Sequence, residues 1–170
     1  MINESSMDIQ IKGRYFSKEK RELIIDFVDW CGKKLLGKRL SKGVSVTVHV
    51  VGPKIYNKQR LYGTTDFSDD DDLWKPRNFT ITITNRFEIL RTLIIVAHEM
   101  VHVKQHAKSE LLYCSRTQLP KWQGVHVDDE KINYWDLPWE IEAHGREKGL
   151  VYQWAQDKDH TDKRWLKEVI

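Results

Sequence analysis

The sequence predicts a compact α+β domain in which a small sheet packs on helices, and three features support this class. Residues 17–36 have the apolar spacing of an amphipathic helix, residues 44–51 and 78–84 alternate as half-buried strands do, and residues 89–102 repeat apolar side chains at helical spacing. The chain has 170 residues, of which 40% are hydrophobic, and a globular chain of this size buries about 70% of its unfolded surface. We therefore expect one domain over residues 17–156, an N-terminal arm over 1–16 and a C-terminal tail over 157–170.

The first predicted helix and the strand that follows it should form one side of the core. Ser17 is a suitable N-cap for the helix over residues 17–36. Its inward positions are Leu23, Phe27, Trp30 and Leu35. In the strand over residues 44–51, valines at every second position share one face, and His49 points to the other face.

A second strand and a long helix follow. In residues 78–84, Phe79, Ile81 and Ile83 alternate with threonines, which predicts a half-buried strand. Asn85 and Glu88 have the spacing of a capping box, so the next helix should begin near Asn85. Its apolar positions are Leu90, Leu93, Ile94, Ala97 and Val101.

The middle of that helix contains the most informative motif of the chain, His98-Glu-Met-Val-His102. Residues four apart share a helical face, so the two imidazoles can bind one metal ion while Glu99 reaches a water molecule bound to it. This His-Glu-x-x-His pattern is the signature of zinc peptidases. The alternative is a buried helix whose two histidines are satisfied by hydrogen bonds.

A catalytic zinc site needs a third protein ligand, and the sequence offers three candidates. His106 lies about 12 Å along the helix axis from His98, which is too far for the same tetrahedron. His126 falls in an expected loop and could fold back as a third imidazole. Glu140 belongs to a second predicted helix that runs from a cap at Asp136, through Pro138 in its first turn, to about Asp157.

The two motifs together resemble those of a known family. His98-Glu-x-x-His102 followed by Glu140-x-Glu142-Ala143 is similar to the compact gluzincins, in which the first glutamate of the second motif is the third zinc ligand. The wider block over residues 138–143 resembles small metallopeptidase-like proteins of bacteriophages, and residues 97–102 also resemble the SprT-like group. The resemblance implies a zincin-like metallopeptidase domain with Zn2+ held by His98, His102 and Glu140.

The sequence departs from this family at one position. Such gluzincins commonly have Asp or Asn four residues after the ligand glutamate, and this chain has His144. An imidazole does not supply the negative charge that orients a zinc-bound histidine, so His144 is either a ligand-orienting or substrate-binding group or a surface residue. Glu142 lies about 200° around the helix from Glu140, so only one of the two can face the metal.

From the chemistry of such sites we expect peptide-bond hydrolysis, with Glu99 as the general base for a zinc-bound water. Tyr134, Tyr152 and His126 are candidates for the donor to the oxyanion, and Tyr134 is nearest in sequence to Glu140. The resemblance implies that the strand over residues 78–84 is the sheet edge that pairs with an extended substrate. The segment over residues 111–135 is expected to form a substrate-binding wall.

Two rival functions remain. The first is a zinc-stabilised binding protein without turnover, although a purely structural site has no need of Glu99. The second keeps the hydrolase chemistry in another setting, as in SprT-like or ImmA-like proteases that act on DNA-associated proteins. A net charge of +3 and the lack of a recognisable DNA-binding motif argue against a nucleic acid partner.

The remaining features concern location and loops. Residues 1–8 lack a basic segment followed by an apolar core, so we expect neither a signal peptide nor a membrane span. Cys31 and Cys114 have no CxxC partner, which favours a reducing compartment, and we expect a cytoplasmic protein, in the host cell if a phage encodes it. The acidic run Asp69–Asp72 lacks the spacing of a calcium loop. We expect a peptide or protein as substrate, and no feature indicates an oligomeric state.

Overall fold

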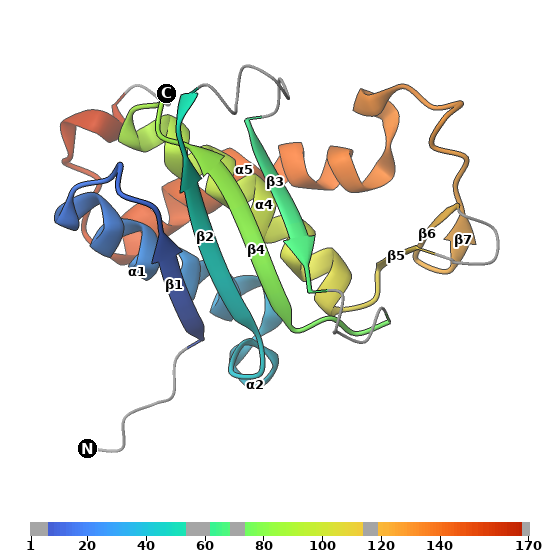
Figure 1. Cartoon of the computed structure of the whole chain (residues 1–170). Coiled ribbons are helices and arrows are strands. Elements are labelled where there is room, and N and C mark those ends of the chain that lie inside the picture. Colours follow the sequence, from blue (N-terminus) through green and yellow to red (C-terminus); the bar gives the residue numbers. More distant parts are fainter. Residues whose placement is uncertain (1–6, 54–61, 69–73, 114–118, 168–170) are drawn as a thin grey trace.

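The computed structural model describes residues 7–53, 62–68, 74–113 and 119–167. Figure 1 shows two layers, with a four-stranded sheet in front and the long helices α1 (Lys18–Leu36), α4 (Ile89–Ala107) and α5 (Pro138–Asp157) behind it. The core lies between the layers, because valine, isoleucine and phenylalanine side chains from one face of the sheet are buried against the helices. This arrangement confirms the α+β class that the sequence predicts.

The sheet is mixed, in the order β1-β2-β4-β3. Strands β1 (Asp8–Lys12), β2 (Ser45–Val51) and β4 (Asn78–Thr84) are parallel, whereas β3 (Gly63–Phe67) is antiparallel to β4. Strand β4 therefore pairs on both sides, and β3 is the edge strand next to it. The expectation that residues 78–84 form a free sheet edge is wrong. The sequence Gly-Thr-Thr-Asp-Phe of β3 has one strongly apolar residue, so alternation does not reveal the strand that covers β4.

Strand β1 lies at the opposite edge of the sheet, within the segment that the sequence predicts to be an arm. Asp8–Lys12 pairs in register with Ser45–His49, and Ile9 and Ile11 pack against the core. Two isoleucines in five residues are too short a pattern to distinguish from an irregular arm. Helix α1 makes the connection between these two parallel strands, and its N-cap is Ser17, as the sequence predicts, with the hydroxyl accepting a hydrogen bond from the backbone N–H of Lys20.

The three long helices pack on one another as well as on the sheet. The ring of Phe27 on α1 meets Trp154 on α5 with ring centroids 5.0 Å apart, and the Trp154 indole N–H donates to Asp26 at 2.9 Å. The predicted inward residues Phe27 and Leu35 are buried, and Leu23 and Trp30 are partly buried against the core. This packing fixes α5 relative to the rest of the domain.

Both long C-terminal helices begin later than predicted. Helix α4 begins at Ile89 with Glu88 as N-cap, so the capping box at Asn85 is wrong, and the Asn85 N–H instead donates to the Val51 carbonyl at the end of β2. Helix α5 has Leu137 as N-cap, whereas Asp136 belongs to a 3-10 turn, η1 (Tyr134–Asp136). The Asn133 side chain caps that turn by accepting a hydrogen bond from the backbone N–H of Trp135.

The smaller elements complete the chain. Between α4 and α5 lies a three-stranded sheet of β5 (Leu111–Tyr113), β6 (Pro120–Trp122) and β7 (Val125–His126); α2 (Lys38–Ser41) follows α1, and η2 (Arg164–Leu166) follows α5. None of the described helices is both long and apolar enough to cross a membrane. The Cys31 thiol is buried, whereas Cys114 and the acidic run Asp69–Asp72 lie outside the described residues.

Candidate metal centre

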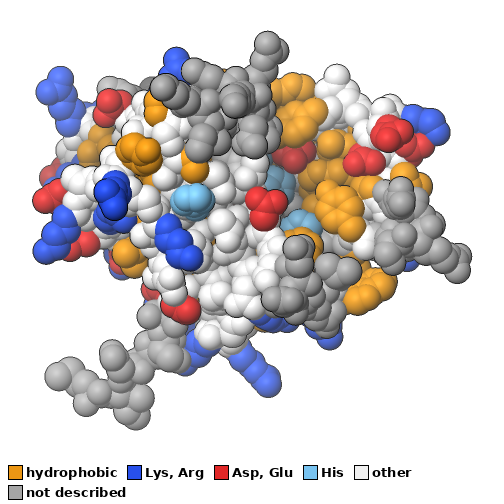
Figure 2. All heavy atoms as spheres, viewed as in Figure 1, with side chains coloured by type: hydrophobic (Ala, Val, Ile, Leu, Met, Phe, Trp, Pro, Cys, Tyr) orange, Lys and Arg blue, Asp and Glu red, His pale blue; other side chains and the backbone are white. Residues whose placement is uncertain are grey.

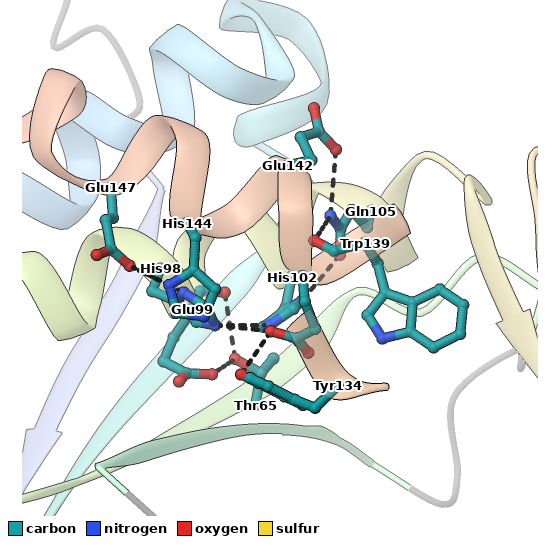
Figure 3. Close-up of polar contacts among 11 residues, drawn as sticks. Thr65, His98, Glu99, His102, Gln105, Tyr134, Trp139, Glu142, His144 and Glu147 are labelled. Atoms are coloured by element: carbon teal, nitrogen blue, oxygen red, sulfur yellow. Dashed lines mark hydrogen bonds and ion pairs between the residues drawn. The ribbon is translucent and has the colours of Figure 1, made fainter. Parts of the chain in front are cut away.

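Two imidazoles and one carboxylate converge where α4 and α5 pack together. His98 and His102 lie one turn apart on α4, and their Nε2 atoms are 3.1 Å apart. The two rings lie side by side on α4 (Figure 3). Glu140, in the first turn of α5, places Oε2 3.2 Å from His98 Nε2 and Oε1 3.6 Å from His102 Nε2. All three side chains are largely shielded from solvent.

The donor set and its spacing fit a tetrahedral metal ion. Imidazole nitrogens and carboxylate oxygens bind zinc at about 2.0–2.2 Å, so neighbouring ligand atoms in a tetrahedron lie about 3.3–3.6 Å apart. The two Nε2 atoms are 3.1 Å apart, and each has one Glu140 oxygen close to this range, Oε2 at 3.2 Å from His98 and Oε1 at 3.6 Å from His102. These three residues could therefore hold a metal ion with one coordination position left over. We call His98, His102 and Glu140 the metal group.

Hydrogen bonds on the far side of each imidazole direct the Nε2 lone pairs inward. His98 Nδ1 lies 3.0 Å from Glu147 Oε2, a carboxylate that can only accept, so Nδ1 is the protonated nitrogen. His102 Nδ1 lies 2.8 Å from Gln105 Oε1. The Gln105 amide orientation is fixed, because its Nε2 donates to the Trp139 carbonyl at 2.9 Å and to Glu142 Oε2 at 3.1 Å. Both rings are thus held with Nδ1 bound on the outer side and Nε2 pointing inward, where Nε2 carries a proton towards Glu140 or, without that proton, can bind a metal.

The electrostatics of this group favour a bound cation. Burial alone would lower the pKa of His98, but hydrogen bonds to Glu140 and Glu147 and the charge of Glu99 outweigh it and raise the pKa to about 9. The pKa of Glu140 is held far below its usual range, because hydrogen bonds from His102, His98 and Tyr134 outweigh the effect of burial. Positive charge is stabilised between these side chains, whether a proton or a metal ion carries it.

Glu99 faces the edge strand rather than joining the other carboxylate. Its side chain is buried, and this burial raises its pKa despite the nearby histidines. Thr65 on β3 donates its hydroxyl hydrogen to Glu99 Oε2 at 2.7 Å. Gly63, also on β3, has no side chain to displace the carboxylate, and a Cβ there would lie 2.7 Å from Glu99 Oε1. Two residues of β3 thus hold Glu99 beside the metal group.

The fourth side of the metal group opens into a cavity of about 570 Å³ between β3, α4 and the start of α5. Figure 2 shows histidine atoms recessed beside a cluster of hydrophobic side chains on the right of this face. The described residues between positions 111 and 135 that line the cavity are Leu111, Tyr113, Tyr134 and Trp135. The Tyr134 hydroxyl donates to Glu140 Oε2 at 2.7 Å, so this residue lies at the site, where the sequence predicts an oxyanion donor.

The other sequence candidates lie outside the metal group. His126 is exposed on β7 and does not line the cavity, so the idea of a third imidazole ligand is wrong. Glu142 faces away from the metal group and forms ion pairs with Lys104 at 2.6 Å and Arg146 at 2.9 Å. His106 lines the cavity further along α4 without joining the group, and Tyr152 is absent from the cavity lining in the described part of the chain.

His144 lies at the site rather than on the free surface. Its ring packs on His98 with centroids 4.4 Å apart, and its Nδ1 lies 3.2 Å from Glu147 Oε2. His98, His144 and Glu147 form a second cluster with the spacing of metal ligands. That cluster would use His98 Nδ1, which is the protonated nitrogen when Nε2 faces Glu140, so the two clusters are alternatives.

Sequence reasoning missed four residues that shape the site: Gly63, Thr65, Gln105 and Glu147. Glu147 was accessible in principle, since it lies seven residues after Glu140 and so on the same face of α5. It supplies the carboxylate that His144 cannot supply. Gly63 and Thr65 lie on β3, a strand that the sequence does not predict, and no local pattern identifies either residue as part of the site.

Comparisons with protein-family models, with curated proteins and with solved structures find no significant match for this chain. Its function is therefore inferred from the chemistry of the site.

Proposed function

We propose that this protein is a zinc-dependent metallopeptidase in which His98, His102 and Glu140 hold the ion and Glu99 is the general base. One observation carries the proposal. Two inward-pointing Nε2 atoms and one carboxylate converge beside a cavity, and a separate buried carboxylate faces the same cavity without belonging to the ligand set. Metal-assisted hydrolysis requires both of these parts, a set of metal ligands and a separate general base.

The ligand chemistry favours zinc and a catalytic site. Two imidazoles with one carboxylate suit a borderline ion in tetrahedral geometry, whereas magnesium and calcium prefer all-oxygen ligands. Structural zinc sites usually have four protein ligands, but catalytic sites have three and keep one position open. Here the fourth position faces a cavity large enough for a peptide, which disfavours the rival of a zinc-stabilised binding protein.

A bound zinc ion would supply a Lewis acid that polarises a carbonyl group and acidifies water. The chain itself would manage the protons. Glu99 accepts one from the attacking water and returns it to the leaving amine, and its raised pKa suits a group that must both take and give a proton. Thr65 holds Oε2 of this carboxylate, and Oε1 lies beside Gly63, where no side chain covers it. The pKa of Tyr134 is raised well above its usual range, so its hydroxyl remains a donor for developing negative charge.

Strand β3 takes over the substrate-edge role that the sequence analysis gave to residues 78–84. It is the edge of the sheet beside the metal group, so its outer N–H and C=O groups can pair with an extended peptide. Its neighbour β4 already uses both of its edges. We propose that a peptide or protein substrate lies in the cavity along β3, with its side chains against the wall over residues 111–135.

The proposal is tested by metal content together with hydrolysis. Protein purified without chelator should contain about one zinc per chain and should cleave a pool of unfolded peptides. Glu140→Ala should lose the metal, whereas Glu142→Ala should keep it. Glu99→Gln should keep zinc and lose hydrolysis, and Glu22→Gln, an exposed change on α1, should change neither. A zinc-loaded parent that cleaves no peptide, or an active Glu99→Gln, would contradict the proposal.

A further inference from the structure

The cavity contains a positive charge that the proposed chemistry does not use. Arg91, on the first turn of α4, lines the cavity beside Tyr62, Ile94 and Ile95. Within the described ranges it is the one lysine or arginine in the cavity lining, and it forms no ion pair with any described residue. The lining carboxylates Glu99, Glu140 and Glu147 all have partners close to the metal group.

Aromatic rings hold the guanidinium in place without neutralising it. The Arg91 Cζ atom lies 5.2 Å from the centroid of Tyr62 and 6.0 Å from that of Phe87, and these two rings contact each other at 5.5 Å. Stacking occupies the face of a guanidinium and leaves the N–H donors on its edge available. The planar donor edge fits a carboxylate through paired hydrogen bonds.

The direction of β3 decides which end of a peptide meets Arg91. Gly63 lies against Ile95 and Glu99, whereas Phe67 lies against His106 with ring centroids 5.1 Å apart, so β3 and α4 run in the same direction. Antiparallel pairing is the more stable way to add a strand. A peptide added antiparallel to β3 would run from the His106 end towards Tyr62 and Arg91. Arg91 would then lie on the C-terminal side of the cleaved bond.

The spacing along the helix sets how far beyond the cleaved bond this residue lies. Arg91 precedes His98 by about two helical turns, or roughly 10.5 Å along the axis. An extended peptide advances about 3.3 Å per residue, so this distance corresponds to about three residues. Between them, the nearly buried Ile94 and Ile95 present apolar surface to the residue that follows the cleaved bond.

Resting on the proposed peptidase function, we infer that Arg91 and Tyr62 form a subsite for a carboxylate two or three residues on the C-terminal side of the cleaved bond, after an apolar residue. The carboxylate has two possible sources, the free C-terminus of a short peptide or the side chain of an aspartate or glutamate within a longer one. The first source would make the protein act near chain ends, and the second would make it select internal acidic sequences.

Peptides that carry a zinc-binding group test this subsite without turnover. A hydroxamate joined to Leu-Ala-Ala places the peptide on the C-terminal side of the metal. Three versions are compared on the zinc-loaded protein by calorimetry: the free acid, the C-terminal amide, and an amide with aspartate as the last residue. Tighter binding of the free acid than of the neutral amide shows recognition of a chain end, and tighter binding of the aspartyl amide than of the neutral amide shows recognition of an acidic side chain.

We expect at least one carboxylate version to bind about tenfold more tightly than the neutral amide, which corresponds to about 1.4 kcal/mol. Arg91→Gln should remove this preference while leaving zinc content and the affinity of the neutral amide unchanged. Arg39→Gln, which removes the same charge from an exposed position on α2, should retain the preference.

The remaining outcomes contradict either the subsite alone or the subsite together with the proposed function. If all three peptides bind the zinc-loaded parent equally, or if the preference survives in Arg91→Gln, the carboxylate subsite is wrong and the peptidase proposal stands. If none of them binds the zinc-loaded protein, both the proposed function and the subsite that rests on it are wrong.

Discussion

Gly63→Ala tests whether the missing side chain at Gly63 on β3 provides the space that the Glu99 carboxylate occupies. A Cβ at this position would lie 2.7 Å from Glu99 Oε1 and 2.8 Å from Ile95 Cγ2. Ordinary contacts of these kinds need about 3.4 Å or more, so the strand or the carboxylate must move by about 0.7 Å. Overpacking of this kind costs about 1–3 kcal/mol of the free energy of unfolding. A shift of about 1 Å in a catalytic group can cost about a hundredfold in rate.

We therefore expect Gly63→Ala to bind zinc as the parent does, to melt about 2–12 °C lower, and to hydrolyse peptides at least tenfold more slowly. The measurements are metal content, thermal unfolding followed by circular dichroism, and kcat/KM on the peptide pool. Gly149→Ala on α5 is the matched control, because a Cβ there meets no atom within 4 Å and alanine favours a helix. A folded, zinc-loaded Gly63→Ala protein with the activity of the parent would refute the idea that Gly63 provides space for Glu99.

Three further predictions concern the ligand supports and the helix packing. Glu147→Gln removes the negative charge beside His98 Nδ1 and should weaken zinc affinity about 10–100-fold in a competition assay with a fluorescent chelator, whereas unchanged affinity would mean that Glu147 does not support the ligand. Thr65→Val removes the hydrogen bond to Glu99 and should lower kcat at unchanged zinc content; a parent-like kcat would show that this bond has no role in positioning the base. Asp26 has a folded-state pKa below its usual value, since bonds from Lys158 and Trp154 outweigh burial, so its stabilising effect is present above the unfolded pKa of about 3.8 and is lost as the pH falls through the folded pKa. Asp26→Asn should therefore lower the melting temperature at pH 7 by a few degrees and by less at pH 3, and an equal loss at both pH values would exclude the ionic contribution.

Sequence reasoning succeeded where one helix determines the geometry. The four-residue spacing of His98 and His102 places both rings on one face of α4 whatever the rest of the fold does. Glu140 was named from the resemblance of its motif to that of the gluzincins, and the structure places it beside both rings. The alternating valines of β2 and the cap at Ser17 likewise have local causes. These features depend on residues that are close in the sequence.

Predictions from the sequence were wrong where contacts between segments distant in the sequence determine the structure. Strand β3 exists because its backbone pairs with β4, and its composition gives no sign of this. The edge role was therefore given to residues 78–84, which the structure places inside the sheet. The contact between Glu147 and His98 also joins two helices, and the sequence shows only that Glu147 shares a face of α5 with Glu140. The caps at Asn85 and Asp136 failed because a tertiary hydrogen bond and a 3-10 turn replaced the local pattern.

The proposed metal position lies between the Nε2 atoms of His98 and His102 and the carboxylate of Glu140. Anomalous diffraction at the zinc absorption edge, from crystals of protein purified without chelator, tests it most directly. We predict one peak about 2.0–2.2 Å from each of these three ligands, with the fourth position open to the cavity. No peak at this position, or a peak between His98 Nδ1, His144 and Glu147, would contradict it.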